Sequence, residues 1–218
     1  MRRKPPRRTR ERILETSLRL FNELGEPNAT TTAIAGALEI SPGNLYYHFR
    51  NKDEIVDALF DDFQREIDPL LDSPLAGTAQ IEDAWLFLHL LFEAIWRYRF
   101  VYRDLNDLLS RNRRVERRFH RIVERKTLAA LALCRSLVSH GDAGATDEEI
   151  ESLATNMVVV TTWWLSFEYV RNVRRPGNAE LPSASMARGA YQVLSLIAPW
   201  LDEEGRSLFR RLAGEYLR

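Results

Sequence analysis

Cysteine is almost absent from this chain, which has one, Cys134, among 218 residues. A single cysteine excludes an intrachain disulfide and a metal site built from several thiolates, and it fits a reducing compartment. We expect Cys134 to pack as a small buried apolar residue rather than to react as a thiol. The sequence also lacks a glycine-rich loop, an internal repeat and an alternating strand pattern, so nothing in it predicts a sheet or a phosphate-binding loop.

Long hydrophobic runs are missing as well. The longest apolar stretch, MVVVTTWWLSF at 157–167, is shorter than the roughly 20 residues that a membrane-spanning helix needs. The amino-terminal segment MRRKPPRRTRER is basic, but no apolar segment follows it as in a secretory signal. We therefore expect a cytoplasmic protein that makes no membrane contact.

The net charge is zero, yet the charges are distributed unevenly along the chain. Residues 1–52 contain ten Lys and Arg against five Asp and Glu, whereas residues 53–83 contain one against ten. Residues 97–126 are basic again, with eleven against four. Such asymmetry predicts that one end of the chain meets a polyanion while the rest has another task.

Apolar residues recur at helical spacing through most of the chain, which predicts an all-α protein. The predicted helices cover residues 8–24, 31–38, 42–49, a stretch that opens at Lys52, 79–99, 101–110, 112–140, 147–173, 184–199 and 205–217. The clearest loops are Asp72–Gly77, GDAGAT at 141–146 and RRPGNAELP at 174–182. We divide the chain into an amino-terminal domain, residues 1–62, and a larger helical domain, residues 63–218.

A tight turn joins the two short predicted helices at 31–38 and 42–49. Thr30 or Thr31 can cap the first helix and Ser41 the second, and the proline after Ser41 suits the first helical position because its missing N–H would have no partner there. Two helices joined in this way form a helix-turn-helix, a motif that places its second helix in the major groove of DNA.

The second helix of this motif is expected to have a buried side, formed by Leu45 and Phe49, and a polar side. Hydroxyl and amide groups on the polar side, and the N–H groups at the helix start, can donate to phosphate oxygens. Glycine lets the backbone come close to DNA, and lysine adds a cationic contact. The candidate DNA contacts of this segment are Ser41, Gly43, Asn44, Tyr46, Tyr47, His48 and Lys52.

Other roles remain open for some of these side chains. One of the two tyrosines is expected to be partly packed, and His48 suits a surface cap as well as a phosphate contact. No second ligand lies at metal-ligand spacing from His48. Because the helix has no Arg, Gln or Lys to read a base with two hydrogen bonds, sequence preference must come from Asn44, the tyrosines, Thr32 or DNA shape.

The stretch TTTAIAGALEISPGNLYYHFRNKDEIVDALF resembles the DNA-binding segment of the TetR family of bacterial transcriptional regulators. That family has a threonine-led helix, a short turn, and then roughly S-x-G-x-L-Y-x-H-F followed by K-[DE]. The matching residues are Ser41, Gly43, Leu45, Tyr46, His48, Phe49 and Lys52. The resemblance covers about residues 8–62 and implies a three-helix DNA-binding domain followed by a larger ligand-binding and dimerisation domain.

The resemblance implies that a set of polar residues lies against DNA. These residues are Thr31, Thr32, Asn44, Tyr46, Tyr47, His48 and Lys52. One departure is Glu39, because the family usually has glycine in the turn; glutamate disfavours positive φ and places a negative charge near phosphates. Either the turn bends differently here, or Glu39 points away from DNA.

The basic amino-terminal arm is expected to add phosphate or minor-groove contacts, with disorder in the absence of DNA as the alternative. Its cations are Arg2, Arg3, Lys4, Arg7, Arg8, Arg10 and Arg12.

A single helix-turn-helix makes too few contacts for useful specificity, so we expect a homodimer on paired half-sites. The helix at 147–173 is apolar on nearly all sides over Met157–Leu165, and with the helix at 184–199 it is expected to form a four-helix interface with its symmetry mate. The family resemblance implies dimerisation at the same place. The interface side chains expected from the second helix are Met186, Ala190, Tyr191, Val193, Leu194 and Ile197.

Aromatic residues are concentrated in the larger domain, and as a set they predict a pocket for an apolar or aromatic effector. The candidate lining residues are Trp85, His89, Glu93, Trp96, Tyr102, Asn156, Trp163 and Phe167. For each aromatic ring on its own, core packing is the favoured interpretation, and His89 and Glu93 can simply hydrogen-bond each other. An enzyme that uses this pair is disfavoured, because no nucleophile, metal cluster or phosphate loop accompanies it; we expect no cofactor and no metal.

The run RNRRVERRFHRIVERK at 111–126 is a second candidate polyanion site. Its arginines fall on several helix faces, and salt bridges to the acidic helix that opens at Lys52 are the main expectation. An anionic effector or a second nucleic-acid surface is the alternative.

Together these features predict a cytoplasmic, homodimeric transcriptional regulator, more often a repressor, that binds a pseudo-palindromic operator through residues 30–52. A small apolar or aromatic effector is expected to release it from DNA. The alternative is a DNA-bound factor of the same fold that a protein partner controls.

Overall fold

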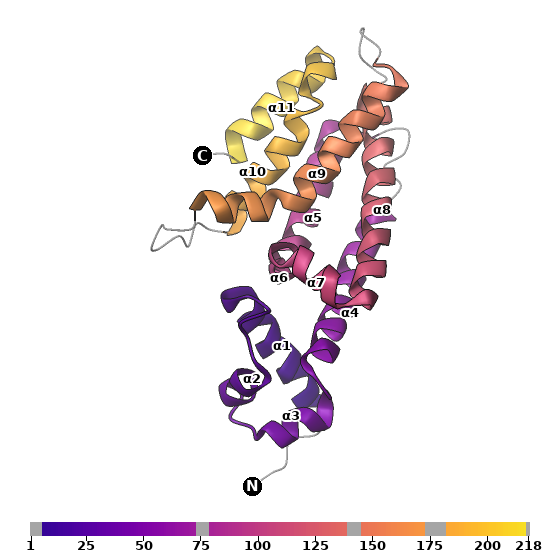
Figure 1. Cartoon of the computed structure of the whole chain (residues 1–218). Coiled ribbons are helices and arrows are strands. Elements are labelled where there is room, and N and C mark those ends of the chain that lie inside the picture. Colours follow the sequence, from indigo (N-terminus) through magenta and orange to yellow (C-terminus); the bar gives the residue numbers. More distant parts are fainter. Residues whose placement is uncertain (1–5, 73–78, 139–144, 173–181, 217–218) are drawn as a thin grey trace. The chain divides into compact units, whose positions relative to one another are not determined.

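The computed structural model describes residues 6–72, 79–138, 145–172 and 182–216 (Figure 1). These residues form helices joined by turns, without a strand among them, which confirms the all-α prediction. The elements are α1 (Pro6–Leu24), α2 (Thr31–Ala37), α3 (Pro42–His48), α4 (Lys52–Leu71), α5 (Ile81–Arg97), α6 (Arg99–Arg103), α7 (Leu105–Arg111), α8 (Arg113–Val138), α9 (Asp147–Asn172), α10 (Pro182–Ser195), η1 (Ala198–Trp200) and α11 (Glu203–Tyr216). None of the helices in this part of the chain is long and apolar enough to cross a membrane.

Most helix boundaries lie within a few residues of those predicted, but the predicted helix at 101–110 is divided at Asp104 into α6 and α7. Asp104 is not helical (φ −102°, ψ 19°), and its Oδ2 accepts a hydrogen bond from the backbone N–H of Glu26 at 2.8 Å. Helical periodicity does not reveal so distant a partner. The predicted loops at 72–77, 141–146 and 174–182 fall mostly outside the described residues.

The chain folds into two compact units that do not follow the predicted division at residue 62. Unit 1 contains the residues up to 65 together with 98–118, and unit 2 contains 66–97 together with the residues from 119 onward. Unit 1 is discontinuous in sequence because α6 returns to pack against α1. Helices α4 and α8 each contribute residues to both units.

Aromatic rings fill the core of unit 1. The ring centroid of Phe21 lies 5.3 Å from that of Phe100. The centroid of Phe63 lies 5.6 Å from that of Phe60 and 5.9 Å from that of Tyr102. All five side chains are buried, and burial of a side chain of this size stabilises a fold by about 1.5–3 kcal/mol. This core fixes α1 and α4, which support the helix-turn-helix.

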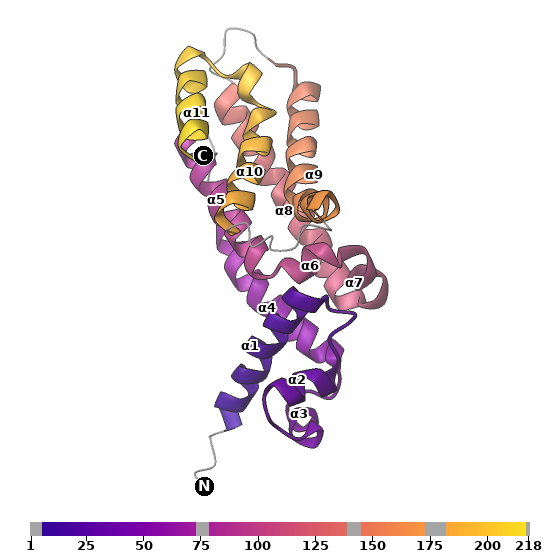
Figure 2. The same cartoon turned by 90° about the vertical axis from the view of Figure 1, so that its left-hand side faces the viewer.

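In unit 2, α10 lies beside α5 and α9 in both views (Figures 1 and 2). Glycine permits this close approach, because a Cβ atom at Gly189 would lie 2.7 Å from the Phe92 ring and 2.9 Å from Trp164. Cys134 of α8 is buried in the same unit, as expected, with its Sγ 3.5 Å from the sulfur of Met157, and burial raises the pKa of its thiol to about 11.

The core of unit 2 uses most of the apolar α10 side chains that were expected in a dimer interface. The side chains already buried within the chain are Met186, Ala190, Val193, Leu194 and Ile197. The sixth predicted residue, Tyr191, stacks on Phe209 with 5.5 Å between ring centroids. The five buried side chains therefore pack within the chain itself, and the role of α10 as a helix of the dimer interface stays a prediction.

Salt bridges join the arginine-rich start of α8 to the acidic α4, which confirms the main expectation for residues 111–126. Within unit 1, Arg118 pairs with Asp61, and Arg114 lies 3.7 Å from Asp57. Within unit 2, Arg125 pairs with Asp68 and lies 2.5 Å from Asp72. These partners neutralise much of the basic run.

Candidate nucleic-acid interface and effector cavity

Side chains cap both helices of the helix-turn-helix. The Thr30 hydroxyl accepts a hydrogen bond from Ala33 N at 3.1 Å, so Thr30 rather than Thr31 caps α2. The Ser41 hydroxyl accepts one from Asn44 N at 3.2 Å, which confirms Ser41 as the cap of α3. Each cap stabilises its helix by about 1 kcal/mol. Short-range sequence signals therefore define the start of both helices.

The turn between α2 and α3 has a left-handed residue, Glu39, at φ 55°. It is the one non-glycine residue with positive φ in the described ranges. The turn thus keeps the conformation that glycine would adopt without strain, and glutamate does so at a cost of about 1–2 kcal/mol. Of the two alternatives for Glu39, a differently bent turn is therefore wrong. The residue is exposed.

One side of α3 is buried and the other is open. Leu45 and Phe49 are buried, as predicted. Tyr46 is 47% exposed and Tyr47 80% exposed, whereas the imidazole of His48 is half-buried with its ring centroid 5.2 Å from that of Tyr47. The polar tips of this helix therefore lie at the surface.

The start of α2 and the middle of α3 form one polar surface. The hydroxyls of Thr31 and Tyr46 lie 3.0 Å apart, within hydrogen-bonding distance. Thr32 and Asn44 are both exposed. This hydrogen bond orients the ring of Tyr46 and links the two helices across the turn.

Nothing within the described chain requires glycine at Gly43. A Cβ atom there would meet only the Ser41 hydroxyl, at 4.0 Å. Glycine in a helix costs about 0.5–1 kcal/mol relative to alanine. The open space in front of Gly43 fits the prediction that another molecule approaches the backbone at this point.

Lys52 is placed differently from the prediction. Its ammonium donates to the Glu26 carbonyl oxygen at 2.9 Å and lies 3.0 Å from Glu26 Oε1. A cation held by a buried carboxylate is not a plain phosphate contact. The predicted role of Lys52 is therefore corrected to a structural one.

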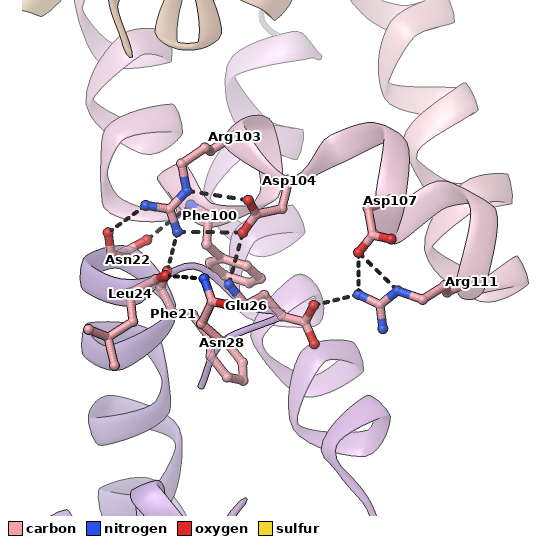
Figure 3. Close-up of polar contacts among 10 residues, drawn as sticks. All are labelled: Phe21, Asn22, Leu24, Glu26, Asn28, Phe100, Arg103, Asp104, Asp107 and Arg111. Atoms are coloured by element: carbon pink, nitrogen blue, oxygen red, sulfur yellow. Dashed lines mark hydrogen bonds and ion pairs between the residues drawn. The ribbon is translucent and has the colours of Figure 1, made fainter. Parts of the chain in front are cut away.

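Glu26 is the centre of a polar cluster that holds the loop after α1 in place (Figure 3). Its carboxylate is fully buried and accepts a hydrogen bond from Arg111 Nη2 at 2.5 Å. Arg111 also donates to Asp107, and these hydrogen bonds, to Asp107 first and then Glu26, raise the pKa of Arg111. Gly25, at φ 92°, turns the chain into this position.

Arg103 extends the cluster to the end of α1 (Figure 3). Its guanidinium donates to the Phe21 carbonyl at 2.7 Å and to the Asn22 carbonyl at 3.3 Å. The Asn22 side chain accepts a hydrogen bond from Phe100 N at 3.1 Å. The last carbonyls of α1 thereby gain partners, and the helix-turn-helix gains a rigid support.

Two arginines supply cations near the end of α3. Arg50 comes two residues after this helix and is exposed, although the sequence analysis did not select it. Its position next to Phe49, which was expected to be buried, could have indicated it. Arg10 of the arm lies over the Phe49 ring, with its Cζ 4.8 Å from the centroid. The predicted contacts of Arg2, Arg3 and Lys4, and the side chain of Arg7, lie outside the described residues.

The eight residues predicted to form an effector pocket do not converge on one cavity. Trp85 is buried, whereas Glu93, Asn156, Trp163 and Phe167 are exposed. Tyr102 belongs to the core of unit 1. His89 and Trp96 are half-buried, and His89 pairs with Glu93 at 3.5 Å. Periodicity cannot show which rings face a cavity, so the predicted lining is wrong.

Unit 2 instead contains a small cavity of about 20 Å³ between α5, α8, α9 and α10. It is lined by Phe87, Leu88, Leu91, Lys126, Ala130, Leu133, Met157, Val158, Thr161 and Val193. Lys126 is the one titratable residue of this lining, and it is buried. Burial lowers the pKa of its ammonium group to about 7.

A helix-turn-helix with exposed polar tips, attached to a larger helical unit, defines a class of DNA-binding regulators. The family model for bacterial regulatory proteins of the tetR family matches residues 13–59, and the model for a bacterial transcriptional repressor, TetR, matches residues 62–209. The chain is 34% identical to a TetR-family transcriptional regulator from Marinobacter aquaeolei VT8 of known crystal structure, with a TM-score of 0.82 over 96% of this chain and 99% of that one. The chain therefore belongs to the TetR family of bacterial transcriptional regulators.

Two regulators of Escherichia coli match a short part of the chain in sequence. The HTH-type transcriptional regulator UidR of strain K12 is 41% identical over 51 residues, or 23% of this chain and 26% of that protein. The tetracycline repressor protein class C is 40% identical over 50 residues, or 23% of each chain. The chain thus matches about a quarter of the length of these curated relatives (26% and 23%).

Proposed function

We propose that this TetR-family regulator is a cytoplasmic homodimer that represses transcription by binding a pseudo-palindromic operator through α2 and α3. The carrying observation is the exposed polar face of α3, with Tyr47 80% exposed opposite the buried Leu45 and Phe49. Phosphate contacts would come from the exposed hydroxyl and amide groups and from Arg10 and Arg50. The DNA contacts proposed on α2 and α3 are Thr31, Thr32, Ser41, Gly43, Asn44, Tyr46, Tyr47 and His48.

The apolar outer face of α9 supports the homodimer. Val159, Trp163, Phe167 and Val170 recur at the spacing of one helix face and are all exposed in the single chain. Burial of such a stripe against its symmetry mate would remove a large apolar patch from water. This stripe replaces the α10 side chains as the proposed interface.

Dimerisation is testable with the pair Trp163→Glu and Phe167→Glu. Each should convert the dimer to monomer in sedimentation equilibrium, because a carboxylate would be buried without a partner. Leu24→Glu, at an apolar residue of unit 1 that is 51% exposed, is the matched control and should remain dimeric. A wild-type protein that sediments as a monomer at micromolar concentration would refute the dimer.

DNA binding is testable with a duplex selected from a random library by the wild-type protein. Tyr47→Ala and Asn44→Ala should each weaken binding to that duplex about tenfold in fluorescence anisotropy, which is about 1.4 kcal/mol, without a change in stability. Tyr169→Ala, at a tyrosine of α9 that is 57% exposed, is the control. Wild-type affinity in both α3 variants would refute the proposed contacts.

Release from DNA is proposed to follow effector binding in unit 2. An effector that binds more tightly to a conformation with a different spacing of the two recognition helices would shift the dimer toward that state. Control by a protein partner is disfavoured as the alternative. Such a partner would dock on the basic run at 111–126, but Arg114, Arg118 and Arg125 of this run already pair with acidic residues.

A further inference from the structure

The outer face of α3 presents an amide and an aromatic ring. Successive residues of an α-helix are rotated by about 100°, so Gly43 and Tyr47 lie nearly opposite the buried Leu45. Asn44 lies next to Tyr47 on this face, because residues three apart on a helix are neighbours. Both side chains are exposed, and the space in front of Gly43 beside them is open.

The other two polar side chains of α3 are held in different directions. The Tyr46 hydroxyl lies 3.0 Å from the hydroxyl of Thr31 at the start of α2. The first helix of a helix-turn-helix crosses the DNA backbone, so this pair belongs with the phosphate contacts. The half-buried imidazole of His48 packs against the Tyr47 ring, with 5.2 Å between ring centroids. Asn44 and Tyr47 are thus the side chains that project furthest from the domain.

The side-chain amide of Asn44 is available to a base. The backbone N–H of Asn44 donates to the Ser41 hydroxyl, and its exposed amide has no hydrogen-bond partner in the described part of the chain. The amide offers a donor and an acceptor side by side, which match N7 and the N6 amino group of adenine in the major groove. Guanine presents two acceptors there, so the amide oxygen would face the O6 atom of guanine without a hydrogen bond.

The ring of Tyr47 is suited to an apolar contact. It is 80% exposed, and the apolar group that the major groove offers is the C5-methyl group of thymine. Packing of the ring on this methyl group would remove both from water, which corresponds to about a fourfold gain in affinity. Cytosine lacks the methyl group and would not give this gain.

We propose that Asn44 and Tyr47 are the base-reading residues of this regulator, and that they select an adenine and a thymine methyl group in each half-site. The inference rests on the proposed function and names its sequence preference. Cβ atoms of residues three apart on a helix are about 5–6 Å apart, and successive base pairs stack about 3.4 Å apart. The two bases should therefore lie within about two base pairs of each other.

The cations that follow α3 serve affinity rather than sequence preference. Arg50 comes after Phe49, whose extended backbone (φ −141°, ψ 117°) ends the helix, and its backbone N–H donates to Glu54 at 2.9 Å. An exposed cation at this point suits a phosphate, which is the same in every sequence. Lys52 is held by Glu26. The segment Pro42–His48 itself contains no Arg, Lys or Gln that could read guanine or adenine in place of Asn44.

The first test changes single atoms of the DNA and leaves the protein as it is. The duplex that the wild type selects from a random library is made with 7-deazaadenine at each adenine in turn, which replaces N7 by carbon. A second series has uracil at each thymine, which removes the C5-methyl group. Fluorescence anisotropy should find an adenine in the half-site whose replacement weakens binding about tenfold. It should find a thymine within about two base pairs whose replacement weakens binding about fourfold.

The second test assigns each base to its side chain. Asn44→Ala should lose the sensitivity to 7-deazaadenine and keep the sensitivity to uracil, whereas Tyr47→Ala should show the reverse. Tyr47→Phe keeps the ring and should remain sensitive to uracil. Asn44→Arg should change the preference at its base pair from A·T to G·C, because arginine donates to both N7 and O6 of guanine.

The matched control is Arg50→Ala, which removes a proposed phosphate contact beside the same helix. It should weaken binding to every duplex by the same factor and keep both analogue sensitivities. The slope of log affinity against log salt concentration should decrease in magnitude by about one.

The analogue series can refute the assignment with the wild type alone, so it does not depend on the folding of a variant. If base-pair replacements weaken binding but no single analogue does, DNA shape is read instead and the assignment is wrong. Full sensitivity to 7-deazaadenine in Asn44→Ala, or to uracil in Tyr47→Ala, would also overturn it.

These outcomes are separate from the failure of the proposed function. A wild-type protein that prefers its selected duplex but tolerates every analogue loses only the roles of Asn44 and Tyr47 as base readers. A wild-type protein that selects no sequence from the library loses the proposed operator binding, and this inference with it.

Discussion

Each unit buries a charged side chain, but the two are surrounded differently. In unit 1, the Glu26 carboxylate is fully buried between two cations, Lys52 at 3.0 Å and Arg111 at 2.5 Å. In unit 2, Lys126 lines an apolar cavity, with the Thr162 hydroxyl at 3.5 Å. Glu26 and Lys126 are buried to nearly the same extent, so the two residues differ in the groups that surround them.

This difference separates a charge that joins several segments from a charge whose pKa is set by burial among apolar side chains. Glu26 joins three segments of unit 1, because Lys52 begins α4, Arg111 ends α7 and the Glu26 N–H bonds Asp104. Removal of Glu26 would take the common partner from Lys52 and Arg111, whereas removal of either cation would leave Glu26 paired with the other. Lys126, in contrast, lies among apolar side chains, and burial lowers the pKa of its ammonium group to about 7.

The largest effect is expected from Glu26→Gln. The variant removes the negative charge but keeps the shape of the side chain, so Lys52 and Arg111 lose their common partner. The free energy of unfolding should therefore fall by about 3–5 kcal/mol. Urea denaturation measures this loss. Asp107→Asn, at the exposed partner of Arg111, is the control and should cost less than about 1 kcal/mol. Similar effects from both variants would mean that the burial of Glu26 does not matter.

The second prediction concerns the pH dependence of stability in Lys126→Met. The lysine pKa is about 7 in the folded protein, below its ordinary value of 10.5. Between these values the unfolded chain binds more protons, so this residue makes wild-type stability rise with pH. Below pH 7 the cost of the buried charge is fully present.

Relative to Lys126→Met, wild-type stability should therefore rise by about 1.4 kcal/mol per pH unit from pH 7 to pH 9. Cys134, whose thiol pKa burial raises to about 11, is present in both proteins, so its titration cancels in this difference. Urea denaturation at pH 7, 8 and 9 gives the difference. A constant difference would show that Lys126 keeps an ordinary pKa.

A smaller effect is expected from Lys52→Met. Lys52 is 23% exposed, and Glu26 keeps Arg111 as a partner, so the loss of stability should be about 1–2 kcal/mol. The double variant Lys52→Met/Glu26→Gln should lose less than the sum of the single variants, because the two residues share one interaction. Exact additivity in urea denaturation would contradict the cluster.

Local signals in the sequence predicted the helix-turn-helix well. The Ser41 cap and the buried Leu45 and Phe49 depend on neighbours within a few residues. The α4–α8 salt bridges were also predicted, because long charge runs of opposite sign leave few other pairings. Such features need little knowledge of the tertiary fold.

Apart from the α4–α8 salt bridges, contacts between distant segments were not predicted. Lys52 donates to the carbonyl oxygen of Glu26, 26 residues away. Asp104, which divides the predicted helix at 101–110, accepts a hydrogen bond from Glu26 N, 78 residues away. The prediction of the cavity lining failed for the same reason, since a rotation of about half a turn about the axis of α9 decides whether Trp163 or Thr161 faces inward. A sequence pattern shows that a helix has two sides, but not which neighbour covers each one.

The smallest effect is expected at Glu39, whose charge is exposed and whose strain lies in the backbone. Glu39→Gly should raise stability by about 0.5–1 kcal/mol, because glycine adopts φ 55° without steric cost but loses more chain entropy on folding. Glu39→Asn should raise stability less, since asparagine tolerates the left-handed backbone conformation less readily than glycine. Glu39→Ala removes the charge and keeps the strain, so an equal gain in that variant would assign the effect to charge instead of conformation.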